Sequence, residues 1–148
     1  MTRKIILWFL VVFWMGVIFY FSSMNGFESA RQSKGFLHHT LGSIIDIVNP
    51  NMSDVDKELL IEKLDLPVRK AAHASVYFIL AIFVFLLLES YNIRNIYFYS
   101  LLICFLYACT DEIHQLFVFE RSAEVLDVLI DSCGSIMSLL IIKLVKHK

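Results

Sequence analysis

The chain has 148 residues, of which 58% are hydrophobic and 18% are charged, and its mean hydropathy is +0.69. A soluble domain is usually about 45–50% apolar and about 25% charged, so this composition excludes an ordinary soluble protein and indicates an integral membrane protein. The formal net charge of −1, without a visible basic stripe, gives no basis for binding nucleic acid. The length accommodates one domain, which we assign to residues 1–148.

The first predicted element is a membrane-spanning helix at residues 5–21, which carry no charge and follow Arg3 and Lys4. A cleaved signal peptide is the alternative. The apolar core of a signal peptide usually has about 7–15 residues and leads to an A-x-A cleavage site, whereas this run is longer and no such site follows it. We therefore predict a helix that stays in the membrane.

The next segment, residues 22–70, is predicted to be helical rather than a flexible linker. Some of its apolar side chains recur at the spacing of one helix face, which indicates an amphipathic helix in the membrane surface. These residues are Leu37, Leu41, Ile44, Ile45 and Val48. Ser53 with Asp56 three residues later resembles a capping box, and it predicts a second short helix that runs through Leu64. Pro67 is expected to stop that helix before the second span.

Three further spans follow this loop. They are predicted at residues 71–90, 96–117 and 124–143. A helix needs roughly 20 apolar residues to cross the hydrocarbon core of a membrane, and the last two segments reach that length only by including ionisable residues near one end. The predicted fold is therefore all-α: an integral membrane four-helix bundle with an amphipathic helical outer loop between spans one and two.

Basic residues in the short flanking segments orient the bundle. With four spans all of them fall on the same side, and that side should be the cytoplasm. They are Arg3, Lys4, Arg94, Lys143, Lys146 and Lys148. We therefore expect a multi-pass protein with cytoplasmic N- and C-termini, with residues 22–70 and the turn around Arg121 on the outer side.

The unusual polar residues of spans two, three and four all lie near the outer end of the bundle. Within each helix several of them recur at four-residue spacing, so they share a face. These sets are His73 and Tyr77; Tyr107, Asp111 and Gln115; and Asp127 and Asp131. Charged residues inside a membrane usually face the bundle interior and pair with one another. We therefore predict one polar pocket that three helices share.

The predicted pocket suits an anionic ligand. Its rim carries Arg69, Lys70 and Arg121, and such side chains bind phosphate-like or sulfate-like headgroups. Tyr77 and Tyr107 are expected to line its walls. The remaining residues that we assign to ligand binding are Gln115, Asp127 and Asp131.

Proton transfer is the other chemistry that these residues allow. If the protein is an enzyme, we predict Asp111 as the base, with His73 or Glu112 assisting. Asp111 is expected to face Asp127 or Asp131 across the bundle, where like charges would place an acid beside a base. The D-E-x-H sequence lacks the histidine pair of H-E-x-x-H, so no metal is predicted, and no cofactor fingerprint is present.

Two stretches of the chain resemble the VanZ-like family of small bacterial membrane proteins. They are "VRKAAHASVYFIL" (68–80) and "DEIHQLFVFERSAEVLDVLIDSCGS" (111–135). The patterns R-K-x-x-H, D-E-x-x-Q, R and D-x-x-x-D, in this order, carry the resemblance. The turn before Arg121 departs from the family, which usually has Pro-Gly there. The resemblance implies a four-span protein of the bacterial cell membrane, in a family whose namesake is associated with low-level resistance to teicoplanin.

The residues and the resemblance together predict a function at the cell envelope. We expect the protein to bind or act on a membrane lipid or lipid-linked precursor through an outer-leaflet polar pocket, and so to affect susceptibility to the antibiotic teicoplanin. Catalysis and homo-oligomerisation are both left open. The alternative is a non-catalytic structural or partner subunit of a membrane complex, whose buried charges only pair with one another.

Overall fold

The computed structural model describes residues 2–49 and 51–146, so Lys148, the last of the lysines used for orientation, lies outside the described residues. The described part is helical and contains no strand. Its helices are α1 (Thr2–Ser22), α2 (Gly26–Val48), α3 (Asp54–Ser90), α4 (Ile96–Gln115) and α5 (Val125–Lys146). All but α2 are long and apolar enough to cross a membrane. The predicted all-α fold with four spans is confirmed.

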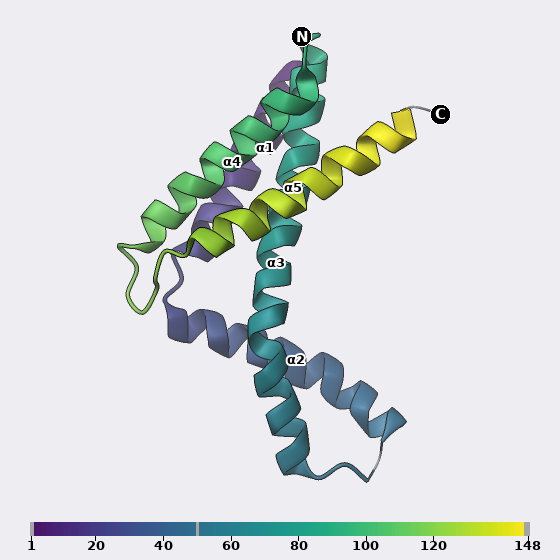
Figure 1. The fold of residues 1–148 in the computed structure, drawn as a ribbon, viewed down its shortest axis with the longest axis vertical. Helices are drawn as coiled ribbons and strands as arrows, with labels where there is room; N and C mark the ends of the chain where they lie inside the picture. The colour runs from purple at the N-terminus through teal and green to yellow at the C-terminus, as the bar shows by residue number, and fades with distance from the viewer. Residues whose placement is uncertain (1, 50, 147–148) are drawn as a thin grey trace.

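The four apolar helices form a bundle, and α2 lies across the N-terminal half of α3, beyond the end of that bundle (Figure 1). The two termini and the α3–α4 turn are at the opposite end. With 37 residues, α3 is about 55 Å long, well over the roughly 30 Å of a hydrocarbon core. Only part of α3 can therefore lie in the membrane, and its first turns extend beyond it together with α2.

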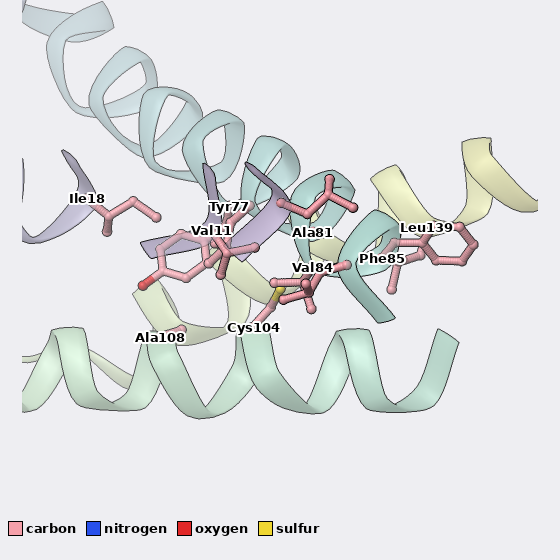
Figure 2. Packing of buried hydrophobic residues seen from close by; sticks show 12 residues of the cluster. Val11, Ile18, Tyr77, Ala81, Val84, Phe85, Cys104, Ala108 and Leu139 are labelled. Atoms are coloured by element: carbon pink, nitrogen blue, oxygen red, sulfur yellow. The ribbon is translucent and has the colours of Figure 1, made fainter. Parts of the chain in front are cut away.

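The centre of the bundle is α3, which packs against every other helix. Figure 2 shows apolar side chains of four helices meeting around it. The fully buried members from α3 are Tyr77, Leu80, Ala81, Val84 and Phe85. Many large apolar side chains of the bundle, such as Phe9, Phe98 and Leu140, are instead exposed on its outside. This inversion is expected where lipid rather than water surrounds a helix.

One close crossing fixes α5 against α3. A Cβ atom added to Gly134 would lie 2.1 Å from the backbone oxygen of Ala74, so only glycine fits at this contact. One residue later, the Ser135 hydroxyl donates to the Tyr77 carbonyl at 3.4 Å. Small residues commonly allow such close approach in membrane bundles. On the other side of α3, the Trp14 indole donates to the Val76 carbonyl at 2.8 Å.

The expectation that Pro67 ends a short helix is wrong. Ser53 caps the helix as predicted, accepting a hydrogen bond from the Asp56 backbone at 3.1 Å, but α3 then continues through Pro67 to Ser90. A proline inside a helix removes one backbone donor and crowds the carbonyl four residues earlier. The burial of side chains before and after Pro67 compensates for this loss of helix stability, because Ile61 packs beneath α2 and Tyr77 packs in the bundle core.

Helix α2 is amphipathic, although its inner face is narrower than the sequence suggests. Leu37 and Ile45 are buried, whereas Ile44 and Val48 are exposed. A short hydrogen bond from the Ser33 hydroxyl to the buried carboxylate of Asp65, and a contact between His38 and Glu58 at 3.5 Å, join α2 to α3. The exposed apolar face fits the expected position in a membrane surface.

Candidate functional site

Polar residues of α3, α4 and α5 lie in two layers near the end of the bundle that is opposite the two termini. On each helix two of these residues are four positions apart, which places one of them a helical turn deeper in the bundle than the other. The inner layer consists of Tyr77, Asp111 and Asp131, each at most 3% exposed. The outer layer consists of His73, Gln115 and Asp127, which line a polar cavity of about 130 Å³. The structure thus places these predicted site residues at the same end of the bundle, but only those of the outer layer line the cavity.

The polar cavity takes its walls from α3, from the α4–α5 loop and from the start of α5. Its charged lining residues are Arg69, Lys70, Glu120, Arg121, Glu124 and Asp127. Neither Asp111, Glu112, Asp131 nor the two predicted wall tyrosines line it. The predicted ligand-binding set is therefore only partly in contact with this cavity.

Lys70 joins α3 to the first turn of α5. Its ammonium makes a short ion pair with Asp127 and a second one with Glu124 at 3.2 Å. Glu124 was missed in the sequence analysis, although its position three residues before Asp127 places it next to that residue at the start of a helix. Because two carboxylates already compensate Lys70, its charge is less available to a ligand than its position at the rim suggests.

The two adjacent carboxylates of α4 also make contacts to other segments. The Asp111 carboxylate accepts a hydrogen bond from the Ser22 hydroxyl at 2.7 Å, which ties α4 to the end of α1. The Glu112 carboxylate accepts one from the backbone N–H of Glu124 at 2.9 Å, which fixes the start of α5. Ser22 is fully buried, and its sequence context of "FYFSS" gives no signal of this role.

The tyrosines lie deeper than the cavity. The Tyr107 hydroxyl donates to the Met15 carbonyl at 2.6 Å, and so connects α4 to α1. The Tyr77 ring lies 6.2 Å from the Tyr107 ring, and the Tyr77 hydroxyl has no hydrogen-bond partner among the described residues. Asp131 is buried in the inner layer together with Asp111, whereas Asp127 lines the polar cavity.

The loop that carries Arg121 is fastened to the turn between α1 and α2. The Arg121 Nε donates to the Met24 carbonyl at 3.2 Å, and the Gly26 N–H donates to the Phe119 carbonyl at 3.3 Å. A Cβ atom on Gly26 would lie 2.3 Å from the Glu120 backbone oxygen. Glu120 itself has a φ of 58°, in the left-handed region that glycine adopts easily. A residue other than glycine thus occupies a left-handed position in the turn where the sequence departs from the family's Pro-Gly.

A second cavity, of about 390 Å³, adjoins the first between the end of α1, α2 and α3. Most of its lining surface is apolar, although Ser29, Gln32 and Ser33 of α2 line it as well. The two cavities share Arg69, His73 and Arg121, which therefore lie where a polar space meets an apolar one.

The two arginines at this junction have no acidic partner. Within the described ranges, neither Arg69 nor Arg121 has a carboxylate within the 4.0 Å of an ion pair. Burial lowers the pKa of the Arg121 guanidinium from its ordinary value, and the positive charge of Arg69 lowers that pKa further. An arginine nevertheless stays charged at physiological pH. Two half-buried positive charges thus lie near each other, and the carboxylates of Asp111, Glu112 and Asp127 act on Arg121 only from beyond ion-pair distance. An anion in direct contact with the two guanidinium groups would stabilise this arrangement.

The four apolar helices and the buried polar layers define a multi-pass membrane protein with a polar site at one end of its bundle. The chain belongs to the VanZ/LLP1 family, whose family model matches residues 7–146. Neither a curated protein nor a solved structure matches the chain.

Proposed function

We propose that this protein binds the anionic headgroup of a membrane lipid or lipid-linked envelope precursor at the junction of the two cavities. The observation that carries this proposal is the convergence of Arg69 and Arg121, from α3 and from the α4–α5 loop, with no carboxylate of the described residues within ion-pair distance of either. Guanidinium groups make paired, charge-assisted hydrogen bonds to phosphate oxygens. A headgroup would therefore replace the water that these two side chains lose on burial.

The charge distribution supports a position in the outer leaflet of a bacterial cell membrane. Arg3, Lys4, Arg94, Lys143 and Lys146 gather at the end of the bundle opposite the two arginines. Positively charged flanks usually face the cytoplasm. On this basis both termini are cytoplasmic, and the site faces the cell exterior. Teicoplanin carries a fatty acyl tail, so a protein that holds outer-leaflet lipids or lipid-linked precursors would alter its access to the membrane.

The contacts favour binding over catalysis. Asp111, the predicted base, is 3% exposed, lies a helical turn beneath the polar cavity and is hydrogen-bonded to Ser22. Glu112 is committed to the backbone of Glu124. Of the three predicted catalytic residues, only His73 lines a cavity. A reaction at Asp111 would require the outer layer to move aside, whereas headgroup binding at the arginines needs no such movement.

Native mass spectrometry of the purified protein tests this proposal. We expect the wild type to retain a phosphate-bearing lipid from the membrane, and the variants Arg69→Gln and Arg121→Gln to lose it. Arg94→Gln is the matched control, because Arg94 is exposed at the opposite end of the bundle. Equal lipid retention by all four proteins, at equal abundance, would overturn the proposal. In a Gram-positive host, the same variants should lose any effect of the wild type on teicoplanin susceptibility.

A structural or partner-subunit role is the second candidate, and one observation favours it. Several predicted ligand-binding or catalytic side chains connect helices instead, as Lys70 does with Asp127 and Asp111 does with Ser22. Breaking a buried pair can cost about 3–5 kcal/mol. On this reading, Asp111→Asn lowers abundance and function together, whereas a binding role for the arginines predicts that their variants lose lipid at unchanged abundance.

A further inference from the structure

We propose that the ligand is a phosphate-ester amphiphile whose apolar chain lies in the second cavity, between the end of α1, α2 and α3, while its phosphate is held by Arg69 and Arg121. This inference rests on the proposed function and deepens it, because it names the ligand class and the path of its chain. It is carried by the lining of the second cavity, which differs from that of the first.

The two cavities differ in charge. The polar cavity has three carboxylates in its lining, and two of them are paired with Lys70. The second cavity has no carboxylate in its lining, and its charged side chains are Arg69 and Arg121. A ligand in the second cavity therefore needs a negative charge at one end only. Because the guanidinium is a planar fork that matches phosphate oxygens, a phosphate ester is the group that this pair of arginines fits best.

Away from the arginines, the second cavity is suited to a hydrocarbon chain. Its apolar lining consists of Phe21, Met24, Phe36, Val68, Ala72 and Val76. Phe36 is 62% exposed even though it lines the cavity. An exposed aromatic side chain beside an apolar cavity can pack against a further apolar group. A chain that enters along Phe36 would cover it.

The surrounding helices do not fill this space themselves. Helix α2 has most of its tertiary contacts with α3 and lies across it beyond the end of the bundle, as Figure 1 shows. The Ser33–Asp65 hydrogen bond and the buried Leu37 hold α2 in place. An anionic end at the arginines and an apolar body under α2 thus correspond to the two parts of one amphiphile, with its chain directed along the membrane surface.

Substitution of Ala72 tests the path of the chain. Ala72 lines the second cavity, whereas its neighbour Ala71 lines neither cavity, and both are exposed, so Ala71→Phe is a matched control for Ala72→Phe. The ligands are hexadecyl phosphate, butyl phosphate, inorganic phosphate and hexadecanol, each titrated against the protein in dodecyl maltoside micelles. We expect wild type to prefer hexadecyl phosphate over the three others. Ala72→Phe should weaken that binding roughly tenfold or more, since a filled apolar pocket discriminates by about that factor.

A second pair of variants removes a wall instead of filling the space. Phe36→Ser should weaken hexadecyl phosphate binding and leave butyl phosphate binding unchanged, whereas Ile47→Ser, at an exposed position of α2 that does not line the cavity, should change neither. The inference is overturned if Ala72→Phe and Phe36→Ser both bind hexadecyl phosphate like the wild type. In that case, loss of all phosphate binding by Arg121→Gln still supports the proposed headgroup site. If the wild type binds no phosphate ester, the proposed function fails as well. If inorganic phosphate binds as tightly as hexadecyl phosphate, the chain contributes nothing and the inference fails alone.

Discussion

Both ends of the bundle carry charged residues, but their charged side chains differ in burial and in partners. At the end with the termini, Arg3 contacts Glu89 at 3.8 Å, Lys146 pairs with the same carboxylate, and Lys4 lies 4.1 Å above the Tyr91 ring. Arg3 and Lys146 are exposed, with the Arg3 side chain 70% accessible, whereas Glu89 and Lys4 are half-buried. At the other end, Asp111 and Asp131 are almost completely buried. Exposed pairs contribute about 0–1 kcal/mol, whereas a buried polar group that loses its partner is costly. The buried polar residues at this end therefore contribute to the stability of the fold as well as to the candidate site.

The largest expected effect concerns the helix crossing beneath the polar end. Gly134→Ala places a Cβ atom against the Ala74 backbone, which cannot move aside as a side chain can. We expect a loss of about 3 kcal/mol or failure to accumulate, as for severe overpacking. The measurement is thermal unfolding in detergent together with abundance in the membrane. Gly16→Ala is the control, because a Cβ at Gly16 meets nothing within 4 Å. If both variants behave like the wild type, the crossing is looser than described.

A smaller effect is expected at the loop that carries Arg121. Glu112→Ala leaves the Glu124 backbone N–H without its acceptor, at a cost of about 1–3 kcal/mol. The midpoint of thermal unfolding should therefore fall, and Glu112→Gln, which keeps an acceptor oxygen, should recover most of the loss. Glu62→Ala, an exposed glutamate of α3, should have little effect. Equal midpoints for Glu112→Ala and the wild type would show that Glu112 does not hold this loop.

The smallest effect is expected at the terminal end. Glu89→Gln removes the carboxylate that Arg3 and Lys146 share, but the partners are exposed. We expect a destabilisation of about 0.5 kcal/mol or less, because water and salt already screen these charges. Unfolding midpoints measured at low and high salt check this expectation. A loss as large as that of Glu112→Ala would mean that the two ends do not differ as described.

Much of this architecture could be predicted from the sequence. Hydropathy identifies the membrane-spanning helices, and helical periodicity indicates which residues share one face of a helix. The four-residue spacing of Asp127 and Asp131 correctly placed both on one side of α5. It could not place Asp127 against Lys70 and Asp131 in the buried inner layer, since these positions depend on how far each helix is rotated and displaced in the bundle. Ser22 was missed for the same reason, because its partner Asp111 lies on a helix far along the chain.

The error at Pro67 has a different origin. The local rule for proline is sound, but it concerns the cost of one missing hydrogen bond, and tertiary burial on both sides of Pro67 outweighs that cost. The backbone of Glu120 could not be predicted either. A glutamate gives no indication of a left-handed conformation, and the structure shows this conformation where the loop meets Gly26.

The continuity of α3 also affects how the protein can move. Helices bend most readily where a proline interrupts the hydrogen-bond ladder. Pro67 lies two residues before Arg69, between the part of α3 that carries α2 and the part that carries the bundle core. Bending at this point changes the angle between α2 and the bundle and leaves Tyr77 in place. We expect such bending to widen or narrow the space beneath α2 without any repacking of the core.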